Sequence, residues 1–396
     1  MSAKRLIKLA EILDAAASHM NEWGATTVSL NEVAKAVGLS RNSLYYYFKD
    51  RLALVVACYL RSGEVQGADL ADACKLASSA ADQLEIFVNR QLDANRQEQA
   101  ILCDLDSLPD SYRTQIQAIN QQNTAALALI IQRGIDSQEF RVVNVDIAVQ
   151  VLLGMLSWTQ LWQKWHGFDR SAAEAMIDVF LNGMSANRSY HFECAVHVQT
   201  LRARHVNLFD SANVSAEKRL QLIGVASLLF NQKGIESTSL DDLADYIGAT
   251  KGSIYHYFKD KPSLVRECYE NAFEQYEMFA KISFGGASDG LNKILTALHL
   301  NCQAQASNNP PLILQSGLSA YSSDYNLQAL ALVEQYENIR LEAIRDGSVR
   351  DVGKGSVELS AGSFFWVQAW LIQNPETNDL LLADSICHVI SGGLKR

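Results

Sequence analysis

Residues 21–59 read NEWGATTVSLNEVAKAVGLSRNSLYYYFKDRLALVVACY, and residues 231–269 read NQKGIESTSLDDLADYIGATKGSIYHYFKDKPSLVRECY. The two stretches align without a gap at an offset of 210 residues, and the run Tyr47–Asp50 recurs unchanged as Tyr257–Asp260. Self-similarity this dense at one fixed spacing indicates a duplicated structural unit. The sequence therefore predicts two copies of one unit within the chain.

Each stretch predicts helices that begin and end at recognisable residues. Apolar residues recur at three- and four-residue spacing over 6–22, and 217–232 repeats the pattern, so one face of each segment should be buried. Ser29 and Glu32 stand three residues apart, which predicts a capping box at the start of a second helix. With only 5 Pro and 22 Gly, long segments contain few helix breakers, which favours an all-α fold.

A tight turn should link the second helix to a short third helix. Gly38 and its counterpart Gly248 permit the positive φ that bends the chain sharply. Ser40 can cap a third helix over 40–48, and 250–258 repeats this helix. The first turn of this helix carries basic, amide and hydroxyl groups, which read base edges and hold phosphates in a major groove. The pattern predicts two helix-turn-helix units.

In both copies, the small-residue turn followed by Tyr-x-Tyr-Phe-Lys resembles the head of the TetR family of bacterial regulators. The resemblance implies an all-α fold of two tandem units, each with a three-helix DNA-binding head and a helical domain that binds a small effector and dimerises. It also implies which side chains face DNA. In the first head these are Thr27, Ser40, Arg41, Asn42, Ser43, Tyr45, Tyr46 and Lys49; in the second they are Ser237, Thr250, Lys251, Gly252, Ser253, Tyr255, His256 and Lys259.

The repeat continues more weakly downstream, and it sets the expected domain boundaries. Ser157–Trp162 resembles Phe365–Trp370, whereas the segment 190–214 matches neither copy. We therefore predict a first head at 1–50, a first effector and dimerisation domain at 51–189, a connector at 190–214, a second head at 215–260, and a second effector and dimerisation domain at 261–396.

The two heads differ in sequence. The first departs from the family pattern at Asn42 and Tyr46, whereas the second keeps Lys-Gly and Tyr-His-Tyr-Phe, so the heads should prefer different half-sites. The first head is slightly basic and the second is balanced, so we expect the first to contribute more electrostatic affinity for DNA.

The fusion of two copies departs from a family whose members pair as two identical chains. We expect the halves to pack as an intramolecular pseudo-dimer, in which helices at 145–166 and 171–187 meet those at 356–373 and 376–394 in a four-helix bundle. The aromatic residues expected in this interface are Trp158, Trp162, Phe365, Trp366 and Trp370. Two heads placed about 34–36 Å apart would bind an imperfect palindrome.

The resemblance also places a pocket among the middle helices of each half. Aromatic residues there favour a hydrophobic effector, although the same spacing equally suits an ordinary core. The effector-binding candidates are Phe87, Tyr112, Phe273, Tyr276, Tyr321 and Tyr325. The expected partners are a double-stranded DNA operator and this effector, and the expected function is that of a repressor.

Composition excludes other classes of function. The net charge of −10 argues against nucleic acid only at the scale of the whole chain, because contact surfaces are local. No membrane-length apolar stretch and no signal peptide are apparent, which predicts a cytoplasmic protein. The 7 Cys include no CxxC pair, and no enzyme motif is found, so we expect no metal, no cofactor and no enzymatic activity. The carboxylates on the second helix of the second head, Asp241, Asp242 and Asp245, leave open an alternative, a protein-interaction module whose heads no longer bind DNA.

Overall fold

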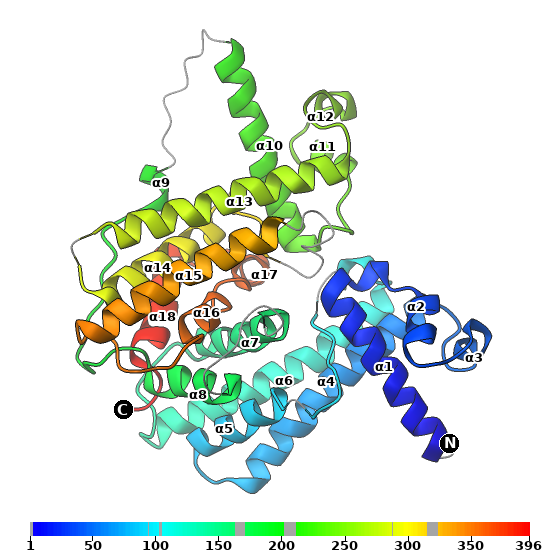
Figure 1. Cartoon of the computed structure of the whole chain (residues 1–396), viewed down its shortest axis with the longest axis horizontal. Coiled ribbons are helices and arrows are strands. Elements are labelled where there is room, and N and C mark those ends of the chain that lie inside the picture. The colour runs from blue at the N-terminus through cyan, green and yellow to red at the C-terminus, as the bar shows by residue number, and fades with distance from the viewer. Residues whose placement is uncertain are drawn as a thin grey trace.

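The computed structural model describes residues 3–93, 95–102, 105–162, 171–201, 211–286, 288–314 and 324–396. Over these ranges the secondary structure is helical, apart from two isolated β-bridges. The first half of the chain, blue to green in Figure 1, lies beside the second half, green to red. No helix within these ranges has the length and apolar character that crossing a membrane requires.

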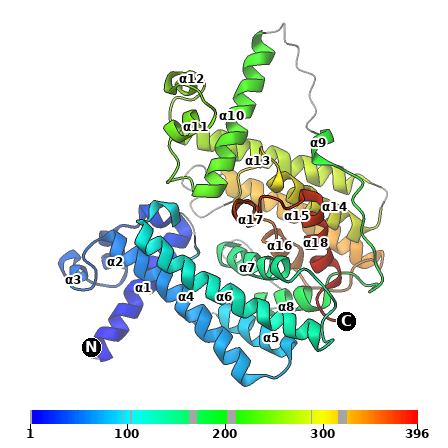
Figure 2. The same cartoon turned by 180° about the vertical axis from the view of Figure 1, so that it is seen from behind.

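The first half consists of a head and a bundle of longer helices. Its α-helices are α1 (Ala3–Trp23), α2 (Leu30–Ala36), α3 (Arg41–Tyr45), α4 (Arg51–Leu76), α5 (Ala80–Gln91), α6 (Asp110–Asp136), α7 (Val145–Trp162) and α8 (Ala172–Asn182). Short 3-10 helices lie at Ala25–Thr27 and Leu105–Ser107. The head comprises α1 to α3, and α4 leads from it into the bundle (Figure 2).

The second half repeats this order after a short connector helix, α9 (Val198–Leu201). Its helices are α10 (Ser211–Lys233), α11 (Leu240–Tyr246), α12 (Lys251–Tyr257), α13 (Lys261–Phe284), α14 (Gly290–Ala306), α15 (Asp324–Arg345), α16 (Ser356–Ala361), α17 (Val367–Gln373) and α18 (Asp379–Gly392). Helix α10 thus corresponds to α1, and α18 corresponds to α8. The fold is all-α and is built from two tandem copies of one helical unit.

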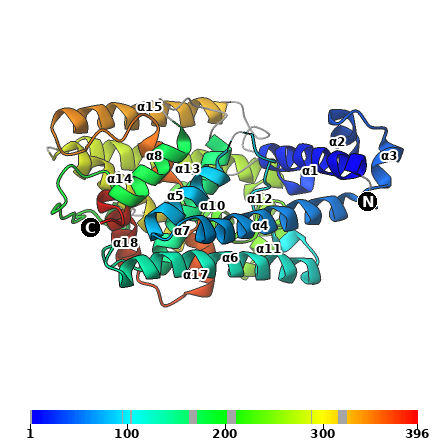
Figure 3. The ribbon, with the colours of Figure 1, turned by 90° about the horizontal axis from the view of Figure 1, so that it is seen from below.

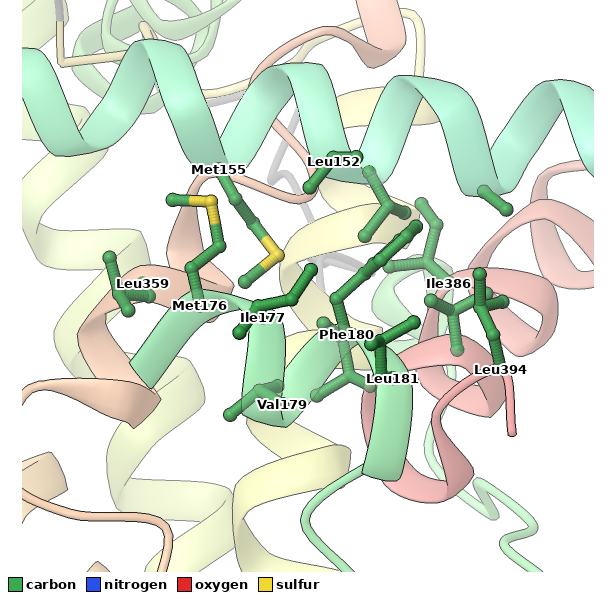
Figure 4. Close-up of a cluster of buried hydrophobic side chains, with 14 of the residues drawn as sticks. Leu152, Met155, Met176, Ile177, Val179, Phe180, Leu181, Leu359, Ile386 and Leu394 are labelled. Carbon is green, nitrogen blue, oxygen red and sulfur yellow. The ribbon is translucent and has the colours of Figure 1, made fainter. Parts of the chain in front are cut away.

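The two halves meet along α7 and α8 of the first and α16 and α18 of the second. Figure 4 shows the apolar side chains that fill this contact, with Met155 and Phe180 from the first half facing Leu359 and Ile386 from the second. All four are fully buried. One hydrophobic core therefore spans both halves, and it lies where the sequence predicted a four-helix bundle.

The second half departs from that prediction at one place, because its counterpart of α7 is broken. Instead of one helix, residues 356–373 form α16 and α17, separated by a turn over 362–366. The buried hydroxyls of Ser356, Ser360 and Ser363 each donate to the carbonyl oxygen three residues earlier. The hydroxyls of Ser360 and Ser363 bond back at the C-terminal end of α16, where such bonds compete with the helix's own hydrogen bonds and favour a bend.

Arg350 fixes the edge of this contact on one side. Its Nε donates to the carbonyl oxygen of Gly183 at 2.6 Å, and its Nη1 lies 2.9 Å from the Asp178 carboxylate. Its own backbone N–H donates to the carbonyl of Met184 at 3.1 Å. One side chain of the second half thus binds the C-terminal end of α8 in the first half.

Arg141 makes the matching contacts on the other side. Its Nε donates to the carbonyl oxygen of Gly393, and its Nη1 lies 2.6 Å from Nε2 of His388. Its backbone N–H donates to the carbonyl of Leu394 at 2.8 Å. Arg141 and Arg350 are repeat counterparts, as are their acceptors, so the contact between the halves has the reciprocal pattern of a two-fold interface.

Candidate nucleic-acid interface

The first head positions its third helix by local backbone signals. Gly38 has a φ of +68° at the turn, and Ser40 accepts a hydrogen bond from the backbone N–H of Ser43 at 3.1 Å. Leu44 is fully buried, so it holds α3 against the head core. The predicted glycine turn and helix cap are therefore present in the first head, and Gly248 and Thr250 repeat them in the second.

The predicted capping box at Ser29 is only half formed. Ser29 accepts from the backbone N–H of Glu32, but the Glu32 carboxylate lies 2.9 Å from Nε2 of His19 instead of returning to the helix N-terminus. In the second head the shorter Asp242 completes the box with Ser239. The difference arises because His19, on α1, offers Glu32 a partner in another helix.

Most of the expected DNA-facing residues of the first head lie on its surface. Tyr46 is 81% exposed and Tyr45 is 43% exposed, while Ser43 is partly buried. Arg41 donates to the hydroxyl of Tyr45 at 3.2 Å and lies over its ring. The other exposed members of the set are Thr27, Ser40, Asn42 and Lys49. In Figure 3 this head lies at the end of the molecule opposite the C-terminus.

The second head exposes most of its expected DNA-facing residues, but one of them pairs with another residue of the same head. Its exposed members are Thr250, Lys251, Gly252, Ser253, Tyr255, His256 and Lys259. The Lys251 ammonium pairs with the Asp241 carboxylate on α11, and this partner raises the pKa of Lys251. The first head has Asn31 at the position of Asp241, so Arg41 has no such acidic neighbour there. The hydroxyl of Ser237, another expected contact, is buried.

Arg219 connects the second head to the helix that follows it. Its guanidinium donates to the carbonyl oxygen of Tyr257 at 2.8 Å and to the Glu267 carboxylate at 2.8 Å. It also lies over the ring of Phe258, 4.9 Å from the centroid. The end of α12 and the start of α13 are thus held together by one side chain of α10.

The effector-binding candidates that the structure describes lie in different surroundings. Tyr276 lines a cavity of about 90 Å³ in the second half. Phe87 is buried in the shared core, Tyr112 packs against the first head, and Phe273 stacks on Tyr325 with ring centroids 5.7 Å apart. Tyr321 lies outside the described residues.

Other residues that line this cavity were not predicted as effector contacts. They include Glu358 and Ser360 on α16, Phe364 and Phe365 in the turn after it, and Trp158 from the first half. Trp158 and Phe365 were expected in the interface, and their rings do pack together at 4.7 Å. One sequence feature could have pointed to Glu358: it is an acidic residue within an otherwise apolar helical segment. The side chain of Trp162 lies outside the described set, and Trp366 and Trp370 pack edge to face at 5.8 Å.

Comparison with protein families assigns both heads and the first helical domain. The family model described as bacterial regulatory proteins of the tetR family matches residues 12–58 and again 222–268. The model described as tetracyclin repressor-like, C-terminal domain, matches residues 77–184. This chain belongs to the TetR family. It carries two tandem TetR units, as the repeat predicted.

The similarity to curated TetR-family proteins is confined to short stretches. The regulator AcrR of Shigella flexneri is 46% identical over 54 residues, which is 14% of this chain and 25% of AcrR. The repressor KstR2 of Rhodococcus jostii is 36% identical over 58 residues, which is 15% of this chain and 28% of KstR2. The chain thus spans about a quarter of the length of these relatives.

Solved TetR-family structures align with less than half of this chain. The regulator PfmR from Thermus thermophilus aligns over 42% of this chain and 92% of its own, at 25% identity and a TM-score of 0.36. KstR2 of Mycobacterium tuberculosis aligns over 44% of this chain and 91% of its own, at 17% identity and a TM-score of 0.36.

Proposed function

We propose that this TetR-family chain is a cytoplasmic transcriptional repressor whose two heads bind the two unequal half-sites of one operator. The observation that carries the proposal is the pair of capped, exposed helices α3 and α12, attached to halves that contact each other reciprocally. Basic, amide and hydroxyl groups on a helix N-terminal turn suit base edges and phosphates. A small effector that binds in the helical domains would shift the heads and release the DNA.

The linkage of both heads in one chain explains how one molecule reads two half-sites. Tethering raises the effective concentration of the second head to about millimolar once the first has bound. The reading helices differ at Asn42 and Gly252, and at Tyr46 and His256, so the preferred operator is an imperfect palindrome. Asn42 can make two hydrogen bonds to adenine, which Gly252 cannot.

This proposal is tested by using the full chain to select the DNA duplexes that it binds from a library of random sequences. The expected result is an operator with two unequal half-sites protected by one chain, with the stoichiometry measured by sedimentation. Tyr46→Ala should change protection of one half-site, and Tyr255→Ala should change the other. Leu129→Ala, on the exposed face of α6, is the control and should change neither.

Two results would overturn the proposal. A duplex with both half-sites that binds only when a second chain joins would refute the intramolecular arrangement. Selection of no specific sequence would refute DNA recognition and favour the interaction module. The Lys251–Asp241 pair, which occupies a basic group of the second head, is the observation that supports that alternative.

A further inference from the structure

The cavity in the second half has an aromatic wall and one charged residue. Trp158, Tyr276, Tyr336, Phe364 and Phe365 supply the rings. They come from α7, α13, α15 and the turn after α16. Among the described residues that line this cavity, Glu358 alone carries a carboxyl group. A mostly apolar cavity with a few polar groups, here Glu358, Asn301 and Ser360, has the chemistry of a small-molecule site.

The Glu358 carboxylate is buried beside the cavity without a full set of partners. The residue is 6% exposed, and its Oε2 atom is buried with no hydrogen-bond partner among the described residues. Burial raises the pKa of this carboxyl to about 7, and the nearby Glu337 adds to the rise, while Arg340 and Lys354 oppose it. An unpaired buried carboxylate oxygen is costly, so a ligand that donates to it gains affinity.

A second, polar cleft opens on the other side of Glu358. This cleft of about 290 Å³ shares Val333 and Glu358 with the aromatic cavity. Its other lining residues are Glu334, Glu337, Asn338, Lys354 and Gly355. Arg340 binds the Glu337 carboxylate, which leaves the carboxylates of Glu334 and Glu358 against the one ammonium of Lys354. Glu358 thus stands where an apolar chamber meets an acidic entrance, an arrangement that favours a positively charged group attached to an apolar body.

We propose that this site binds a small aromatic amine in its protonated form, and that this ligand is the effector of the regulator. The proposal rests on the proposed function above and names the chemical class of its effector. The ammonium donates charge-assisted hydrogen bonds to Glu358, and the ring lies among Trp158 and Phe365. Aromatic faces such as that of Tyr336 add cation–π attraction.

The residue types that line the second-half side of this site are not repeated in the first half. The pair Gly154 and Gly362 fixes the alignment of α7 with α16, so Leu152 and Leu153 take the places of Ser360 and Ala361. Gln150 takes the place of Glu358. The first half therefore has leucines where the second half has small residues, and it lacks the acid.

The ligand would act on the second head through one continuous cluster. Trp158 and Tyr276 belong to the same buried cluster as Ile254 and Phe258 of that head. Tyr276 lies on α13, and Arg219 ties Glu267 of this helix to the end of α12. Displacement of the cavity wall therefore reaches the reading helix through packed side chains. Trp158 is contributed by the first half, so the same displacement alters the contact between halves.

Calorimetric titration of the full chain without DNA tests the site itself. The probes share one ring and differ in charge: 2-phenylethylamine, 2-phenylethanol and phenylacetate. The amine should bind about tenfold or more tightly than the alcohol, since a charge-assisted bond is worth that much. Equal binding of the alcohol, or tighter binding of phenylacetate, would overturn the proposal.

Variants assign the affinity to the site. Glu358→Gln should weaken amine binding about tenfold and leave alcohol binding within about twofold. Ala361→Leu, which introduces the leucine of the first half, should abolish binding of both. The matched control is Glu85→Gln, the same substitution on the exposed face of α5, and it should change neither affinity. An unchanged amine affinity in Glu358→Gln would refute the site even if Ala361→Leu fails to fold.

Measurements of operator binding distinguish a failure of the ligand site from a failure of the proposed function. Saturating amine should weaken operator binding by the wild-type chain and not by Glu358→Gln. If the amine binds at Glu358 but operator affinity is unchanged, its role as effector is refuted. If no operator is bound at all, the proposed function fails, and the titrations without DNA still decide the site.

Discussion

A methyl group added to Gly154 would lie 2.3 Å from the carbonyl oxygen of Gly362, and one added to Gly362 would lie 2.6 Å from the carbonyl oxygen of Gly154. The two glycines are counterparts in the repeat, so the two halves cross at the same position of each copy. Gly183 and Gly393 have the same relationship, since a methyl group on either would lie within 2.5 Å of the other's backbone nitrogen. Such self-matching contacts lie on the axis of a two-fold interface.

Alanine at the Gly154–Gly362 crossing should therefore destabilise the whole chain. Gly154→Ala and Gly362→Ala each force backbone atoms apart, which costs about 1–3 kcal/mol of unfolding free energy. Chemical denaturation measures this loss. Gly252→Ala is the control, because its added methyl group would meet only the Thr250 hydroxyl at 3.9 Å, and stability should stay equal or rise. Equal stability of all three variants would contradict this close crossing.

The two arginine contacts predict a second experiment, an exchange of residues between the copies. Arg350 has a carboxylate partner in Asp178, whereas Arg141 has the imidazole of His388, and burial lowers the pKa of Arg141 to about 10. His388→Asp should give Arg141 an ion pair and raise the unfolding free energy by up to about 1 kcal/mol. Asp178→His should lower stability. Thermal unfolding of both variants at neutral pH measures whether each is more or less stable than wild type. A loss of stability in both variants would refute the equivalence of the two contacts.

Short-range sequence signals determine the helices and turns of the two heads, so the local structure of the heads was predictable from the sequence. The caps at Ser40 and Thr250 and the turns at Gly38 and Gly248 act within a few residues of themselves. The exposure of Tyr46 followed from the same helical spacing that buries Leu44.

Contacts between distant segments determine what the sequence did not reveal. The partner of Glu32 is His19 on another helix, and the cavity of the second half takes Trp158 from the first. The break after α16 lies where Gly362 meets the backbone of Gly154 in the other half, although the corresponding segment of the first half stays helical. Such features depend on tertiary packing, which sequence spacing does not encode.

Acidification should destabilise the protein through His299. This side chain is buried, with Nδ1 2.8 Å from the Gln303 amide and Nε2 3.1 Å from Asp384. Burial lowers its pKa in the folded chain, although Asp384 opposes this shift. The unfolded chain therefore takes up the proton first, so the stability from neutral His299 is present above pH of about 6.5 and is lost as pH falls below it.

Denaturation at several pH values measures the effect of His299. His299→Gln should flatten the dependence of unfolding free energy on pH between about 7 and 5. His191→Gln is the control at an exposed histidine of the connector and should leave the slope unchanged. A slope that is the same in wild type and His299→Gln would show that this side chain does not carry the acid sensitivity.

The Lys251–Asp241 pair predicts how the second head can be made to resemble the first. Asp241→Asn introduces the residue that the first head has at Asn31, removes a negative charge beside the reading helix and leaves Lys251 available for phosphate. Operator affinity should rise, and the slope of log affinity against log salt should steepen by about 1. The reverse change, Asn31→Asp, should weaken affinity, because it places an acid beside Arg41. If Asp241→Asn alters neither affinity nor salt slope while Asn31→Asp weakens binding, the second head contributes no phosphate contact through Lys251.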